Sequence, residues 1–111
     1  MSKPTLPVLT HLQFLVLGVL RSGGQPGRSL RSALAAFGVR RTGPAFYQLM
    51  ARMEKERLVD GWYEQITVGD QAVTERHYRI TSEGTRRWNE ARIFYEQVVA
   101  RASTKLRWSD A

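Results

Sequence analysis

Basic side chains without acidic neighbours distinguish the first half of the chain. From Glu54, the first acid, to the C-terminus ten Lys and Arg residues balance ten Asp and Glu, so the formal charge of +7 belongs to the first 53 residues. A preference for Arg over Lys would explain the kind of cation but not the absence of acids. A segment like this indicates a polyanionic partner, and we expect double-stranded DNA. Its seven cations are Lys3, Arg21, Arg28, Arg31, Arg40, Arg41 and Arg52.

The chain offers no set of residues suited to catalysis. It contains no Ser/His/Asp or Cys/His combination, and Gly23-Gly24 does not stand between a strand and a helix as a phosphate-binding loop would. Cysteine is absent, which excludes disulfides and thiolate metal sites, and His11 and His77 are isolated. We therefore expect neither an enzyme nor a bound metal or cofactor.

Length and hydrophobicity indicate one globular domain. A chain of 111 residues with 42% hydrophobic content can form a single modest core. The apolar run from Leu12 to Leu20 is too short to cross a bilayer, and no cleavage pattern of small residues follows it. It is more typical of a buried helix, so no membrane contact is expected.

The first helix is expected to begin at Thr10, where Gln13 completes a capping box. Its core stripe repeats at helical spacing, while Phe14 and Leu17 lie off that stripe and are also apolar. This second apolar face suggests a second partner surface. The stripe consists of Leu12, Leu15, Val16, Val19 and Leu20.

Two further helices follow a Gly/Pro loop. The second runs from about Arg28 to Gly38, with Leu30, Ala33, Leu34 and Phe37 facing the core. The third starts at Thr42 or Gly43, with Pro44 in its first turn. Its inward stripe is Phe46, Leu49, Met50 and Met53.

A hairpin and a long helix complete the pattern. Residues 62–67 and 75–80 are rich in aromatic and β-branched residues and predict two strands joined by a tip of about seven residues. Thr81 caps the last helix. The order predicts a mostly α fold with a small β-hairpin: an extended arm over 1–9, a winged helix-turn-helix DNA-binding domain over 10–80 and a C-terminal dimerisation helix over 81–105.

A heptad-like seam on the last helix predicts a homodimer. Apolar residues recur there every three or four positions and need a surface to pack on. A second copy of the chain is the simplest partner, together with Phe14 and Leu17 of the first helix. The seam residues are Trp88, Ala91, Tyr95, Val98 and Ala102.

Two segments resemble the PadR-like transcriptional regulators. Phe46 to Val59 is similar to the family's recognition helix, and Tyr78-Arg-Ile-Thr-Ser-Glu-Gly84 to its junction between wing and dimerisation helix. The resemblance covers about residues 10–100, and the single helix after the wing matches the family's short form. It implies a cytoplasmic homodimer that binds operator DNA, usually as a repressor, and in some members releases DNA when a small hydrophobic compound binds. The chain departs from the pattern at Arg28, Gln48 and Arg57, where an aromatic, Pro and Gly are frequent.

In a winged helix the third helix enters the major groove. Gln48 and Arg52 point outward there, and can pair with adenine and guanine respectively. Arg52 could instead pair with Glu56 one turn away. These two residues are the predicted base contacts.

Phosphate contacts are expected where helices begin. Arg40, Arg41 and Thr42 precede the third helix, and Arg28 and Ser29 open the second, so the helix dipoles add to their charge.

Other side chains have two readings each. Tyr47 either donates to phosphate or packs its ring on the wing. On the wing Gln71, Thr74 and Arg76 could reach DNA, although Arg76 could instead pair across the strands with Glu64 or Glu75.

Two alternatives stay open at this stage. Phe14, Trp88 and Tyr95 could line a pocket for a hydrophobic effector, or could simply be core residues. The basic face could also bind an acidic protein, which would make the chain a winged-helix protein-interaction module.

Overall fold

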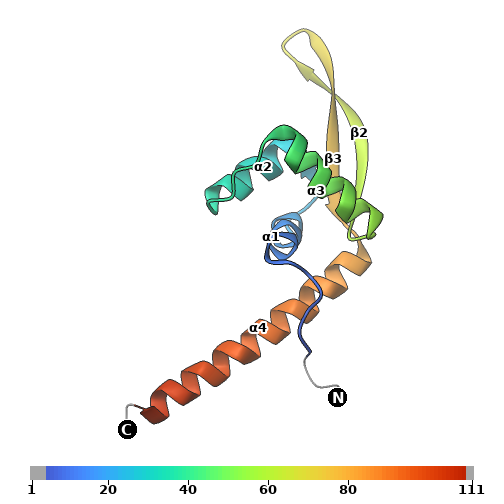
Figure 1. Ribbon diagram of the computed structural model, residues 1–111. Coiled ribbons are helices and arrows are strands. Elements are labelled where there is room, and N and C mark those ends of the chain that lie inside the picture. Colours follow the sequence, from blue (N-terminus) through green and yellow to red (C-terminus); the bar gives the residue numbers. More distant parts are fainter. Residues whose placement is uncertain (1–4, 110–111) are drawn as a thin grey trace.

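The computed structural model describes residues 5–109, with side chains described for residues 5–103. Lys3 and the rest of residues 1–4 lie outside the described part of the arm. The element order confirms a winged helix-turn-helix followed by one long helix (Figure 1). The elements are α1 (His11–Leu20), β1 (Gln25–Pro26), α2 (Gly27–Ala36), α3 (Gly43–Lys55), β2 (Val59–Val68), β3 (Gln71–Ile80) and α4 (Ser82–Ser109).

The hydrophobic core lies between α1, α2, α3 and the base of the sheet. The capping box is present: the Thr10 hydroxyl accepts from the Gln13 N–H at 3.0 Å, and Gln13 Oε1 accepts from the Thr10 N–H at 3.1 Å. Leu17, which lies off the predicted stripe, is fully buried. The buried face of α1 is therefore rotated slightly from the predicted one. Phe37 was expected in the core but is 69% exposed, since α2 ends at Ala36 before its ring can turn inward. The core includes Val16, Leu17, Leu20, Leu30, Leu34, Phe46, Met50, Met53, Leu58 and Tyr78.

The sheet has three antiparallel strands in the order β1-β3-β2. The β2–β3 register runs from Val59 opposite Ile80 to Val68 opposite Gln71. Gly69 has φ 64° in the turn, a conformation that glycine adopts without strain. The hairpin is therefore longer and its turn tighter than the predicted seven-residue tip. β1, which the sequence analysis missed, pairs Gln25 with Tyr78.

One compact joint connects α3, the hairpin and α4. Arg57, two residues after the end of α3, has φ 62°, and the Leu58 N–H donates to the Met53 carbonyl at 2.9 Å, which is the Schellman pattern. The Thr81 hydroxyl donates to the Arg57 carbonyl at 2.7 Å and accepts from the Gly84 N–H at 2.9 Å. Gly84 lies so close to the Leu58 carbonyl that a Cβ would collide with it.

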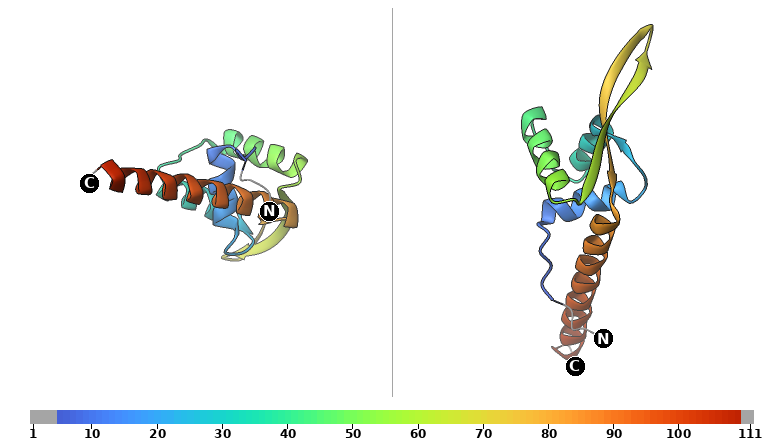
Figure 2. Two further views of the ribbon diagram at one scale, coloured as in Figure 1. Left: turned by 90° about the horizontal axis from the view of Figure 1, so that it is seen from below. Right: turned by 90° about the vertical axis from the view of Figure 1, so that its right-hand side faces the viewer.

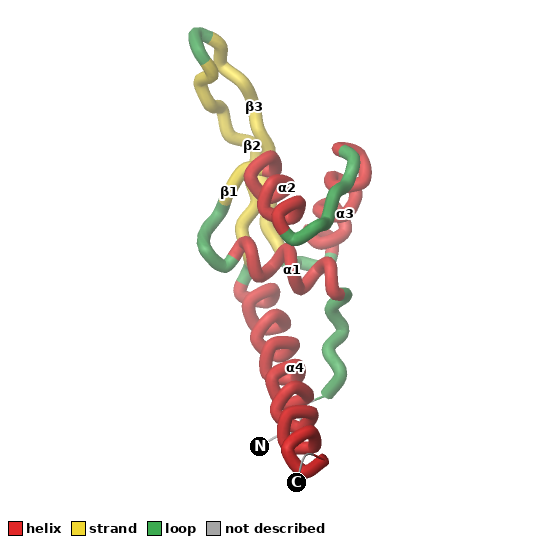
Figure 3. The backbone as a smooth tube through the Cα atoms, turned by 90° about the vertical axis from the view of Figure 1, so that its left-hand side faces the viewer, coloured by secondary structure: helices red, strands yellow, loops and turns green. Residues whose placement is uncertain are grey.

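The hairpin and α4 extend from opposite ends of the helical body (Figures 2 and 3), which gives overall dimensions of 67 × 29 × 22 Å. The first half of α4 packs on α1 and buries Ala91 completely. Farther along, Val98 and Val99 are 49% and 63% exposed. Within the described residues, no helix combines the length and hydrophobicity needed to cross a membrane.

Candidate nucleic-acid interface

The start of α3 lies beside two arginines. The Thr42 side chain accepts from the Ala45 N–H at 3.3 Å, and the first turn contains no acid. Arg40 and Arg41 lie immediately before this turn, and both are exposed. Their charge adds to the positive end of the helix dipole, so this end of α3 favours an anion.

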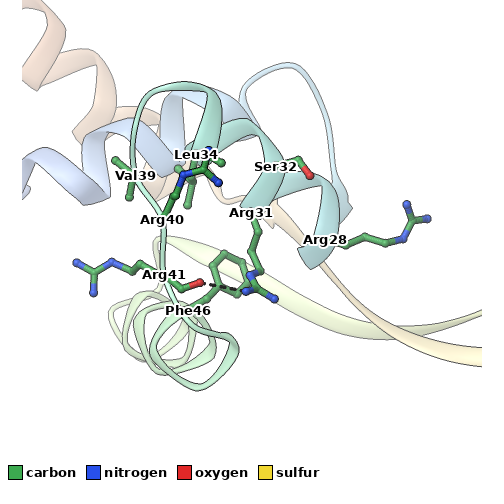
Figure 4. Close-up of a pocket in the computed structure, with 9 residues that line it drawn as sticks. Arg28, Arg31, Ser32, Leu34, Val39, Arg40, Arg41 and Phe46 are labelled. Atoms are coloured by element: carbon green, nitrogen blue, oxygen red, sulfur yellow. Dashed lines mark hydrogen bonds between the residues drawn. The ribbon is translucent and has the colours of Figure 1, made fainter.

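Four arginines surround the junction of α2 and α3. Arg28, Arg31, Arg40 and Arg41 line a hollow of about 300 Å³, and Arg31 Nη2 donates to the Arg41 carbonyl at 3.0 Å (Figure 4). The Arg41 guanidinium points away from those of Arg28 and Arg31 in this view. The charge therefore spreads along an arc instead of meeting at one point, an arrangement suited to successive phosphates.

A second hollow brings the predicted base-reading residues together. This hollow has a volume of about 320 Å³. It is lined by Arg41, Gln48 and Arg52, and by Thr10 and Gln13 at the start of α1. Gln48 and Arg52 are both exposed.

The alternative partner of Arg52 is engaged elsewhere. Glu56 Oε2 accepts from Gln13 Nε2 at 3.0 Å, and the side chains described up to residue 103 include no Arg52–Glu56 ion pair. Arg52 is thus left without the carboxylate that would neutralise it.

Tyr47 lies between α2 and the wing, which comprises β2, β3 and their turn. Its ring packs edge-on against Phe46, with centroids 5.2 Å apart, and its hydroxyl approaches Gly27. The side chain is still 46% exposed. It lines a cleft of about 580 Å³ between α3 and the wing.

The N-terminal end of α2 is less accessible to a phosphate than the sequence predicted. No side chain caps α2, but Arg28 Nε lies 2.6 Å from Glu75 Oε1 on β3. Arg28 itself is 68% exposed, whereas Ser29 is half-buried. A phosphate would have to compete with Glu75 for Arg28.

The wing contributes less positive charge than the sequence pattern suggested. Gln71 and Thr74 are exposed. Arg76, however, turns inward and places Nη2 2.5 Å from Glu54 Oε1 of α3, not against Glu64 or Glu75. Four acids and two arginines occupy residues 59–80. Attraction for a polyanion therefore comes from α2 and α3.

The Glu54–Arg76 pair perturbs the ionisation of its surroundings. Burial would lower the pKa of Arg76, but the hydrogen bond and charge of Glu54 outweigh it and raise the pKa. Burial, reinforced by the charge of Glu54, raises the pKa of Tyr78 to about 12. Sequence reasoning missed this pair because 22 residues separate its members and no local spacing connects them.

The predicted dimer residues divide into three groups. Leu17 and Ala91 are fully buried within one chain, so their assignment to a dimer interface was wrong. The apolar face of α1 is already covered by the chain's own α4: Phe14 stacks on Trp88 at 5.4 Å, and Tyr95 meets Phe14 edge-on at 5.9 Å. Val98 and Ala102 lie beyond this contact and are exposed.

The aromatic cluster of Phe14, Trp88 and Tyr95 carries one unmet polar group. Trp88 Nε1 is buried and has no hydrogen-bond partner in the described part of the chain. The Arg21 guanidinium lies 4.2 Å from the Trp88 ring, so this cation covers the cluster instead of facing α3. Among the described residues, no group of three or more potential metal ligands occurs.

Comparison with known proteins identifies the fold. No family model and no curated protein sequence matches the chain. A PadR family regulator from Eggerthella lenta is 28% identical over 86% of this chain and 80% of its own, with a TM-score of 0.63. A PadR-like regulator from Bacillus cereus is 22% identical over 86% and 90%, with a TM-score of 0.70. Bacillus subtilis PadR in complex with operator DNA is 17% identical over 73% and 46%, with a TM-score of 0.58.

The Eggerthella lenta and Bacillus cereus structures are of transcriptional regulators, and Bacillus subtilis PadR was solved bound to operator DNA. The resemblance carried by Phe46 to Val59 and Tyr78 to Gly84 is confirmed at the level of the fold. The chain has the winged-helix fold of the PadR-like transcriptional regulators.

Proposed function

We propose that this chain is a transcriptional regulator that binds double-stranded DNA sequence-specifically, with α3 in the major groove. The observation that carries the proposal is the exposed arc of arginines around an α3 entrance without acids. The fold adds support, because a protein that shares it, Bacillus subtilis PadR, has been solved with operator DNA. The segregation of charge to the first 53 residues fits the same reading.

We assign the exposed residues to base contacts and to phosphate contacts. Gln48 and Arg52 are the proposed base contacts. The proposed phosphate contacts fix the register on the duplex but carry no sequence information. They are Arg28, Ser29, Arg40, Arg41, Thr42 and Tyr47, with Gln71 and Thr74 from the wing.

We infer that two copies act together, each reading one half-site. The support is the exposed apolar surface of α4 beyond its contact with α1, where Val98 and Ala102 continue the seam. The exposed side chains of Leu6 and Val8 in the arm add apolar surface. Burying this surface between two copies is the simplest way to remove it from water.

Repression in the cytoplasm and release by a hydrophobic effector complete the proposal. A dimer that occupies an operator would block access to it. Phe14, Trp88 and Tyr95 would contact the effector, and the unpaired Trp88 indole N–H could donate a hydrogen bond to it.

Titration of a DNA duplex at several salt concentrations tests the proposal. With about six phosphate contacts per dimer, affinity should fall about a thousandfold between roughly 50 and 200 mM salt. A nearly flat response would contradict it. Weak binding that ignores sequence, together with a tight complex with an acidic protein, would favour the protein-interaction alternative.

Two substitutions separate the proposed roles. Arg41→Ala should weaken binding to all duplexes alike and lower the salt slope by about 0.9 per chain. Arg86→Ala makes the same change of charge on α4, where Glu83 and Glu90 hold the arginine, and serves as control. Gln48→Ala should change which sequence is selected from a random pool. An unchanged preference would show that α3 is placed wrongly.

A further inference from the structure

One ion pair connects the wing directly to α3. Glu54 lies in the last turn of α3 and Arg76 in the middle of β3, and their side chains are only 26% and 24% exposed. Partial exclusion of water strengthens such a contact relative to a pair on the open surface. Arg28–Glu75, the other link to the wing, leaves Arg28 mostly in solvent. The Glu54–Arg76 pair is therefore the better candidate for a fixed connection.

Two aromatic rings and a glycine border the pair. The Arg76 guanidinium lies 4.6 Å from the Tyr63 ring and 6.0 Å from the Tyr78 ring. Gly61 on β2 has no side chain, and the ion pair occupies the space that a side chain there would take. A Cβ at Gly61 would lie 2.7 Å from Arg76 Nη2 and would also collide with Glu54. A larger residue at this position would force at least one of the two side chains to move.

We propose that Glu54 and Arg76 are positioning residues that fix the angle between α3 and the wing and so set sequence discrimination, without contacting DNA themselves. This inference rests on the proposed function. Two elements that bind one duplex must keep a fixed relative geometry for both sets of contacts to form at once. A carboxylate on a DNA-facing cleft repels phosphate, so Glu54 lowers general affinity. Glu54 offsets this loss of affinity because it holds Arg76, and with it the wing, in the position that the correct duplex requires.

A direct phosphate contact by Arg76 is the competing explanation, and it makes different predictions for the salt slope and for the affinity ratio between duplexes. If Arg76 touches phosphate, its removal lowers the salt slope by about 0.9 per chain. Removal of Glu54 would then free Arg76 and tighten binding to every duplex equally. If the pair acts by positioning, either change reduces the difference between the correct duplex and others.

The experiment compares the duplex selected by the wild-type chain with a scrambled duplex of equal length. Glu54→Gln, Arg76→Gln and Gly61→Ala should each lower the ratio of the two affinities about tenfold, equivalent to about 1.4 kcal/mol. The Glu54→Gln/Arg76→Gln double variant should be no worse than either single one, because all remove the same contact. Gly61→Ala keeps both charges, so its salt slope should equal that of the wild type. Asp70→Asn removes an acid at the wing tip and should leave the ratio unchanged.

Backbone hydrogen exchange without DNA supplies an independent measurement. Amides of β2 and β3 should exchange faster in Glu54→Gln and Gly61→Ala than in the wild type. Unchanged exchange, an unchanged affinity ratio or a lower salt slope in Arg76→Gln would each overturn the inference. A wild-type chain that binds no duplex would refute the proposed function and the role in discrimination, while exchange would still decide whether the pair holds the wing.

Discussion

Replacement of Arg57 by glycine should make the protein more stable. Arg57 follows the C-cap of α3 and has φ 62°, in the left-handed region that residues with a Cβ rarely adopt. Its backbone serves the joint, because its carbonyl accepts from Thr81 at 2.7 Å. The side chain is exposed, and no Arg57 ion pair occurs within residues 5–103. Glycine would therefore remove strain without removing a contact.

The size of the effect follows from two opposing terms. A non-glycine residue in the left-handed conformation costs about 1–2 kcal/mol. Replacement by glycine relieves this strain but costs about 0.5–1 kcal/mol, because glycine loses more conformational freedom on folding. The net stabilisation for Arg57→Gly is about 0.5–1 kcal/mol. For a domain of this size that corresponds to a rise of roughly 2–6 °C in Tm.

Thermal and denaturant unfolding at one fixed protein concentration measure the change, since the proposed association of two chains would also affect Tm. Arg57→Ala is the first control: it removes the charge but keeps the strain, and should not gain stability. Lys55→Gly is the second, because it places glycine in an ordinary helical conformation and should lose up to about 1 kcal/mol. If Arg57→Gly proves no more stable than Arg57→Ala, the strain argument is wrong.

Three other perturbations test the joint and the long helix. Thr81→Ala removes the cap of α4 and the bond to α3 and should cost about 2 kcal/mol in unfolding measurements, whereas Thr81→Ser should retain most of it. Hydrogen bonds from Arg86 and Arg87 lower the pKa of Glu83 to about 2. The stability that Glu83 adds is therefore complete above its ordinary pKa of 4.5 and disappears toward pH 2, so the Tm difference between wild type and Glu83→Gln should vanish there. Val98→Glu should dissociate the proposed dimer in light scattering while Gln97→Glu leaves it intact; equal masses for both variants would contradict the proposed interface.

Local rules were sufficient for most of the fold. The capping box at Thr10 and the proline-initiated α3 depend on neighbours in sequence, and both formed where those neighbours predicted them. The two strands also formed, but each extends beyond its predicted range. β1 was missed because its two residues form a strand only by pairing with β3. Phe37 was placed in the core by periodicity alone, and the helix ended one residue too soon to turn it inward.

The candidate site was less accessible to sequence reasoning. Exposed positions on α3 such as Gln48 and Arg52 followed from the helical period, and the structure brings them together with Arg41. The partner of Arg76 could not be predicted in this way, because a contact between α3 and β3 depends on how the hairpin packs against α3. Leu17 and Ala91 were assigned to an interface because nothing in the sequence shows that α4 returns to cover α1.

The length of α4 turns it into a lever. Its 28 residues span about 42 Å at about 1.5 Å per residue, and its first turn is fixed to the end of α3 by Thr81 and Gly84. In a dimer joined at Val98 and Ala102, about 27 Å from this joint at about 1.5 Å per residue, a tilt of about 10° would carry each joint by ~5 Å, somewhat more than the rise of one base pair. Small changes where the two chains meet would therefore become large changes in the spacing of DNA sites that both α3 helices can reach together.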